Sequence, residues 1–72
     1  MINVKIETEV PAGEMIRRLR IEKGLSVDEL AKRSGTTSPS ISRWERGLRT
    51  PSVNNYQLVI EALGAELAIV QK

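Results

Sequence analysis

The chain has 72 residues, a net charge of +2 and neither cysteine nor histidine. A chain this short buries only about 60% of its unfolded surface, so we expect residues 1–72 to form one domain with a small core. Without cysteine, the chain can form neither disulfides nor thiolate metal sites, which leaves oligomerisation as the remaining way to stabilise the fold. Without histidine, it lacks the commonest catalytic base. No apolar run has membrane length and no signal peptide is recognisable, so we expect a cytoplasmic protein without membrane contact.

Residues 2–9 alternate strictly between the two faces of an extended chain, with apolar side chains on one of them, which predicts a half-buried strand. Pro11 stops this strand and suits the first position of a helix, which we predict over residues 11–23. Gly24 ends it. Its apolar side chains recur at helical spacing and should face the core: Ala12, Met15, Ile16 and Leu19.

A second helix is predicted over residues 27–34. Ser26 followed three residues later by Glu29 is a capping box, which closes two orphan backbone donors at once. Gly35 suits the end of this helix, because the left-handed backbone conformation common at helix ends costs glycine less than any other residue. An apolar stripe at helical spacing follows the cap: Val27, Leu30 and Ala31.

A third helix is predicted over residues 38–46, after a tight turn. Thr37 is its expected N-cap. Pro39 is tolerated in the first turn, where a backbone N–H would have no acceptor within the helix. Ile41 and Trp44 lie three residues apart and should face inward. The outside face is then expected to carry hydroxyls and guanidiniums and no carboxylate: Ser38, Ser42, Arg43 and Arg46.

A fourth helix is predicted over residues 51–63. Thr50 and Pro51 are interpreted as its N-cap and first helical residue, and Gly64 as its end. Helical spacing predicts that its buried face consists of Val53, Tyr56, Val59, Ile60 and Leu63.

The last segment, residues 65–71, is predicted to be a strand. Two strands at opposite ends of a chain invite antiparallel pairing, and an uncharged edge recruits further strands. We therefore expect a small intermolecular sheet across a two-fold axis, made by Leu67, Ala68, Ile69 and Val70. The alternative is an intrachain hairpin that covers helices 11–23 and 51–63.

Positive charge is concentrated in the middle of the chain. Residues 17–49 hold nine basic and four acidic side chains, a net charge of +5, whereas the flanks hold two basic and five acidic side chains, a net charge of −3. Because this basic segment overlaps the two short helices, we interpret it as the surface that meets a polyanion.

Residues 12–64 resemble the helix-turn-helix domain of the XRE family, the phage lambda repressor and Cro-like regulators. The resemblance rests on IRRLRIEKGLSVDELAKRSGTTSPSISRWERGLRTPS and on EALG at the end of the fourth helix. It implies a mostly α fold: a four-helix lambda-repressor-like domain, here with short N- and C-terminal β-strands. It also implies an ion pair between Arg20 and Glu45. The C-terminal strand is similar to that of HipB-like antitoxin regulators.

The resemblance also assigns site residues. Positions matching the base-reading residues of the family are Ser38, Pro39 and Arg43, and Ser42 is near enough to reach a base or a phosphate. Arg43 is the strongest candidate because a guanidinium can bond guanine O6 and N7 together, whereas Pro39 offers only apolar contact. Candidate phosphate contacts are Val27, through its backbone, and Thr37, Ser40, Arg46 and Arg49. Arg17 and Lys32 are candidates at the edge and are otherwise plain surface charges.

These observations predict a homodimeric repressor that binds double-stranded DNA at an inverted repeat, without a cofactor or metal. The alternative is an antitoxin that neutralises a cognate toxin protein and regulates its own operon. An enzyme is disfavoured, because the chain has no His, no Cys and no glycine loop that cradles phosphate.

Overall fold

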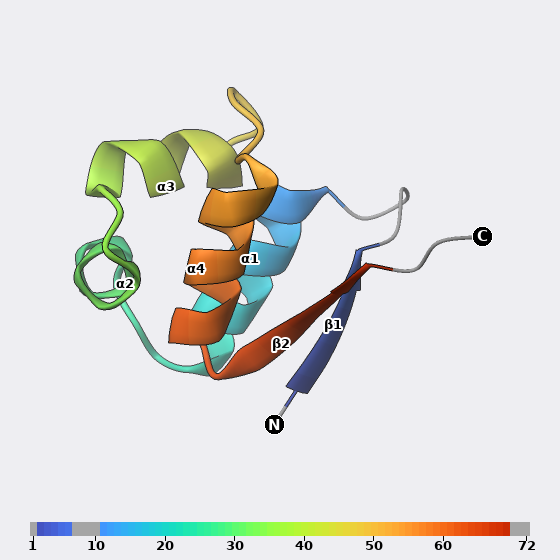
Figure 1. Cartoon of the computed structure of the whole chain (residues 1–72). Helices are drawn as coiled ribbons and strands as arrows, with labels where there is room; N and C mark the ends of the chain where they lie inside the picture. The colour runs from blue at the N-terminus through green and yellow to red at the C-terminus, as the bar shows by residue number, and fades with distance from the viewer. Residues whose placement is uncertain (1, 7–10, 70–72) are drawn as a thin grey trace.

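The computed structural model describes residues 2–6 and 11–69 of the chain (Figure 1). In chain order, the elements are β1 (Ile2–Ile6), α1 (Ala12–Glu22), α2 (Val27–Ser34), α3 (Ser38–Glu45), α4 (Val53–Ala62) and β2 (Ala65–Ile69). The mostly helical, four-helix architecture expected from the sequence is confirmed. None of the described helices has the length and apolar character needed to cross a membrane.

The core lies where the four helices meet. Helices α1 and α2 each pack against both α3 and α4, so α3 is supported from two sides. Ile41 and Trp44 of α3 are buried, as predicted. Burying a side chain of this size is worth about 1.5–3 kcal/mol, so this inner face fixes which face of α3 remains outside. The largest fully buried side chains are Ile16, Leu30, Ile41, Val59, Ile60 and Leu63.

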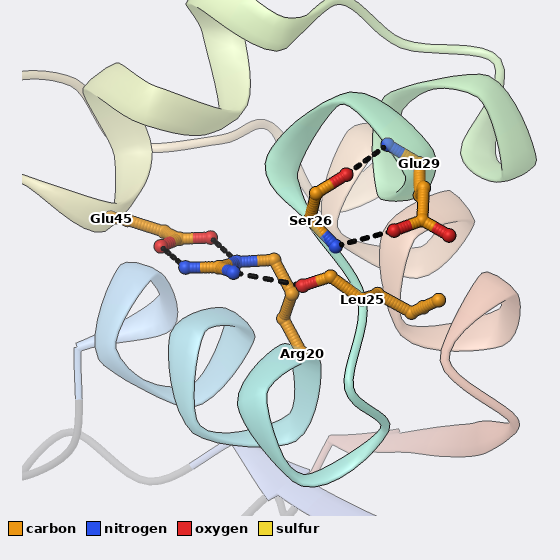
Figure 2. Close-up of polar contacts among 5 residues, drawn as sticks. All are labelled: Arg20, Leu25, Ser26, Glu29 and Glu45. Carbon is orange, nitrogen blue, oxygen red and sulfur yellow. Dashed lines mark hydrogen bonds and ion pairs between the residues drawn. The ribbon is translucent and has the colours of Figure 1, made fainter.

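The start of α2 is closed by the predicted capping box. The Ser26 hydroxyl accepts from the Glu29 backbone N–H, and the Ser26 backbone N–H donates to the Glu29 carboxylate, both at 3.0 Å (Figure 2). The bonds from Ser26 hold the pKa of Glu29 below its usual value. A lowered carboxyl pKa stabilises the fold at neutral pH, and the contribution is lost as the pH falls through the lowered value. Gly35 ends the helix at φ 71°, as expected.

The predicted start of α4 is wrong by two residues. Ser52, not Thr50, is the N-cap, because its hydroxyl accepts from the Asn55 backbone N–H at 3.1 Å. Pro51 precedes the cap and is buried instead of opening the helix. Val53, predicted to be buried, is the first helical residue and is 57% exposed. Similarly, Pro11 is the N-cap of α1 rather than its first residue.

The predicted antiparallel pairing of the terminal strands is also wrong. β1 and β2 pair in parallel within the chain, with Ile2 opposite Ala65 and Ile6 opposite Ile69. The reason lies in the helices: α1 and α4 run in the same direction, β1 leads into α1, and β2 turns back from the end of α4 (Figure 1). Both strands therefore run opposite to α1 and α4 and parallel to each other. Predicted strand residues 7–9, 70 and 71 lie outside the described residues.

Gly13 sets the distance between α1 and α3, a role that the sequence analysis missed. It is buried in the first turn of α1, and a Cβ placed on it would lie 1.7 Å from the carbonyl oxygen of Trp44. Real Cβ atoms do not come so close to backbone, so any larger residue forces the two helices apart. The available signal was a glycine inside an otherwise helical pattern, which often has a packing reason.

A mostly buried ion pair also joins α1 to the end of α3. Arg20 donates through Nε and Nη2 to the two carboxylate oxygens of Glu45, at 2.8 and 2.9 Å, and through Nη1 to the Leu25 carbonyl at 2.9 Å (Figure 2). The Arg20 side chain is 16% exposed and the Glu45 side chain 7%. The hydrogen bond with Glu45 raises the pKa of Arg20, so the guanidinium is fully charged at neutral pH. The pair implied by the family resemblance therefore forms.

We predict that Gly13→Ala destabilises the protein by about 1–3 kcal/mol, the usual cost of overpacking a close contact. This loss should exceed the gain of up to about 1 kcal/mol that alanine brings to an open helical position. Urea denaturation followed by circular dichroism measures the change. A variant more stable than the parent would show that α1 and α3 do not need their close approach.

We predict that Glu45→Gln lowers the free energy of unfolding by about 3 kcal/mol, because it leaves the Arg20 charge without its partner in a mostly buried place. Glu14→Gln is the matched control. It breaks the Glu14–Arg18 pair within α1, where the side chains are 49% and 63% exposed, and should lower the free energy of unfolding by less than about 1 kcal/mol. Equal losses in urea titrations of the two variants would contradict a special role for the buried pair.

Candidate nucleic-acid interface

Local sequence chemistry defines where α3 starts. The Thr37 hydroxyl accepts from the Ser40 backbone N–H at 3.3 Å, which confirms Thr37 as the N-cap. Pro39 lies in the first turn, where a backbone N–H has no intrahelical acceptor in any case. The helix is short, eight residues, and is held by Ile41 and Trp44 on its inner face.

The outer face of α3 presents two rows of side chains. Residues four apart lie one above the other on a helix, so Pro39 and Arg43 form one row and Ser38, Ser42 and the C-cap residue Arg46 form the other. Pro39, Arg43 and Arg46 are exposed, and the two serines are partly exposed. The structure therefore brings the predicted base-reading residues together on one accessible surface, with α3 at the far end of the molecule from β1 and β2 (Figure 1).

The start of α2 meets the start of α3, and it adds an acidic group that the sequence analysis did not place there. The Ser38 hydroxyl donates a hydrogen bond to the Asp28 carboxylate. Asp28 is exposed and Ser38 partly exposed, so both remain accessible from the outer face. Helical spacing within α2 alone does not reveal this contact, because it depends on how α2 and α3 cross.

The hydroxyls of Thr37 and Ser40 are bonded to each other. Thr37 donates to the Ser40 oxygen at 2.8 Å, which uses the Thr37 proton and leaves the Ser40 proton available. Of these two candidate phosphate contacts, Ser40 is therefore the better donor. Val27 is partly buried and packs against the core, so only its backbone N–H, in the first turn of α2, is a candidate donor.

Three exposed guanidiniums stand at the C-terminal end of α3 and just after it: Arg43, Arg46 and Arg49. Within the described part of the chain, the two ion pairs are Arg18–Glu14 and Arg20–Glu45, so these three cations are not neutralised by a pair. Glu45, the acid nearest to them in sequence, is bound to Arg20 instead. Arg49 also lines a cleft of about 300 Å³ between the start of α1 and the loop before α4.

The predicted dimer-strand residues that the structure describes lie apart from this surface (Figure 1). Leu67, Ala68 and Ile69 belong to β2, and Val70 lies outside the described residues. Residues 2–6 and 11–69 contain no group of three or more acidic side chains that would hold a metal ion. The predicted set thus divides into a polar surface on α2 and α3 and a separate strand segment.

Comparison with known proteins identifies the family. Residues 16–70 match the helix-turn-helix family model. An uncharacterized HTH-type transcriptional regulator of Sinorhizobium fredii is 42% identical over 52 residues, which cover 72% of this chain and 68% of that protein. A protein of Aeropyrum pernix, named as an HTH-type transcriptional regulatory protein, is 39% identical over 56 residues. This match covers 78% of the chain but only 17% of the longer Aeropyrum protein.

Solved structures agree with this assignment. The clp gene regulator ClgR of Corynebacterium glutamicum superposes with a TM-score of 0.73 at 34% identity, over 78% of this chain and 60% of that one. A mutant of the restriction–modification controller protein C.Esp1396I superposes with a TM-score of 0.74 at 27% identity, over 78% of this chain and 73% of that one. The chain therefore belongs to the helix-turn-helix family of DNA-binding transcriptional regulators, of the XRE type that its sequence resembles.

Proposed function

We propose that this regulator is a homodimeric repressor that reads an inverted repeat in double-stranded DNA, with α3 of each copy in the major groove. The observation that carries the proposal is the outer face of α3, where Ser38, Pro39, Ser42 and Arg43 stand together on an accessible helix supported by α1 and α2. Recognition helices of this kind place their exposed residues against base edges. Occupying promoter DNA in this way represses transcription.

Base reading falls chiefly to Arg43. Its guanidinium is exposed, forms no ion pair with residues 2–6 or 11–69, lies in the same row as Pro39, and can donate to guanine O6 and N7 together. Pro39 can contribute apolar contact with a thymine methyl, and Ser42 is placed to contact a base or phosphate. Because few side chains in this set have strong base preferences, readout of DNA shape adds to the specificity.

Phosphate contacts fix the position of the protein on the duplex. Ser40 has a hydroxyl proton to donate, and Thr37 supports Ser40 rather than donating itself. The start of α2 at Val27 offers first-turn backbone N–H groups to an anion. Arg46 and Arg49 supply charge at the opposite end of α3.

A dimer accounts for the strands. A two-stranded sheet is marginal by itself, and among the described residues β1 and β2 form a sheet of two strands that packs on α4 through β2. A second copy that adds its strands, with Leu67, Ala68, Ile69 and Val70 at the interface, would extend the sheet. Two α3 helices would then read half-sites separated by one helical turn, about 34 Å, or a multiple of it.

The antitoxin alternative has less support. The relatives named above are transcriptional regulators, which favours the regulator over the antitoxin.

In vitro selection of random duplex DNA with the purified protein tests the proposed function. Enrichment of an inverted repeat is the expected result, and its bases identify what each α3 reads. Failure of any motif to emerge at low salt, where phosphate binding is strongest, would contradict sequence-specific regulation and direct the search to a protein partner.

We predict that Arg43→Ala and Arg46→Ala weaken binding in different ways. Loss of Arg43 should cost about 1–3 kcal/mol on the selected site and relax the preference at one base pair. Loss of Arg46 should weaken binding to all sequences alike and reduce the slope of log K against log salt by about 1. Fluorescence titrations on the selected and scrambled sites, each at several salt concentrations, separate the two effects. Identical behaviour of the two variants would remove Arg43 from the base-reading set.

We predict that deletion of residues 66–72 gives monomers and abolishes tight binding to the inverted repeat, because it removes the strand proposed to join two copies. Sedimentation measures the oligomeric state, and circular dichroism verifies that the helices persist. A folded, truncated chain that still sediments as a dimer would refute the strand interface while leaving DNA binding by α3 intact.

A further inference from the structure

The contact between Asp28 and Ser38 determines which hydrogen-bonding groups this end of the interface offers. Ser38 is the first residue of α3 and one of the candidate base-reading residues, and Asp28 lies in the first turn of α2. The Ser38 hydroxyl donates its only proton to the Asp28 carboxylate. Among the described residues, Ser38 is the hydrogen-bond partner found for the Asp28 side chain.

What remains accessible is therefore made of acceptors. The carboxylate has no proton to donate, and the serine oxygen keeps only its lone pairs once its proton is committed. A free serine hydroxyl would be able to turn and donate to guanine or thymine. The bonded one cannot do so without leaving Asp28 unpaired.

We propose that Asp28, through this bond with Ser38, is a specificity-determining residue that selects a base with an amino group in the major groove. Cytosine N4 and adenine N6 are the amino donors there, and carboxylates characteristically accept from cytosine N4. Guanine presents O6 and N7 and thymine presents O4, all acceptors, which the acceptor pair disfavours. The proposal rests on the proposed docking of α3 in the major groove.

The interface is then divided by chemistry along α3. The acceptor oxygens of Asp28 and Ser38 lie at the N-terminal end of α3, where it meets α2. The guanidinium donors of Arg43 lie five residues further along the helix than Ser38. A helix rises about 1.5 Å per residue, so the two groups meet different base pairs of one half-site. Each half-site should combine an amino-bearing base at one position with a guanine at another.

The test is parallel in vitro selection with the parent protein, Asp28→Asn, Ser38→Ala and Glu61→Gln. Asparagine keeps the size of the side chain but gains amide donors, so Asp28→Asn should accept guanine or thymine at one base pair and reduce the preference there by about 5- to 150-fold. The base read by Arg43 should not change. Ser38→Ala keeps the carboxylate and should retain the amino preference in weaker form.

Glu61→Gln is the matched control, because it makes the same change of charge at an exposed position near the end of α4. It should leave the motif unaltered. A parent protein that selects no motif would overturn the proposed function itself. A parent motif that lacks an amino-bearing base at this end, or an Asp28→Asn motif identical to that of the parent, would overturn the role of Asp28 alone. Uniform tightening on all DNA by Asp28→Asn would show simple charge repulsion and would also overturn it.

Discussion

The placement of α3 depends on one mostly buried ion pair, that between Arg20 and Glu45. α3 is too short to hold its own orientation by helix propensity alone, and Ile41 and Trp44 anchor only its inner face. Arg20 fixes the C-terminal end by a two-point bond to Glu45, and it also holds the Leu25 carbonyl just before α2. One guanidinium on α1 thus joins the end of α3 to the loop that leads into α2. It does so without using any exposed charge of the candidate DNA-binding surface.

The same pair shapes the electrostatics of the interface. Glu45 sits in sequence between Arg43 and Arg46 and would partly cancel their charge if it were exposed. Because Glu45 is bound to Arg20 and mostly buried, it does not cancel the positive charge of Arg43 and Arg46 at the candidate DNA-binding surface. At the other end of the helix, Asp28 lies beside Ser38 and introduces the opposite sign. The surface is therefore polarised along α3, which suits a helix that enters the groove in one orientation.

Local chemistry made the helices predictable, and tertiary geometry limited the rest. The Ser26–Glu29 box, the Thr37 cap and the inward positions of Ile41 and Trp44 follow from short-range spacing, and all were expected from the sequence. By contrast, the contact of Gly13 with Trp44 and that of Asp28 with Ser38 depend on how helices cross. The start of α4 was misjudged because Thr-Pro and Ser are both good N-terminal signals, and only packing, which buries Pro51, decides between them. The candidate DNA surface was predictable as a group of residues but not in its internal hydrogen bonds.

The parallel pairing of β1 with β2 has a kinetic consequence. Ile2 lies opposite Ala65, so the sheet closes a loop of more than 60 residues, whereas the helices contact partners much nearer in the chain. Closing a long loop is entropically costly before its contacts form, so the strands should assemble after the helical core. A chain at this stage thus has α3 in place while the edges of β1 and β2 are still open. In the proposed dimer, the strands of a second copy would compete at that stage with the chain's own strands, so the protein concentration during folding would influence which partner they find.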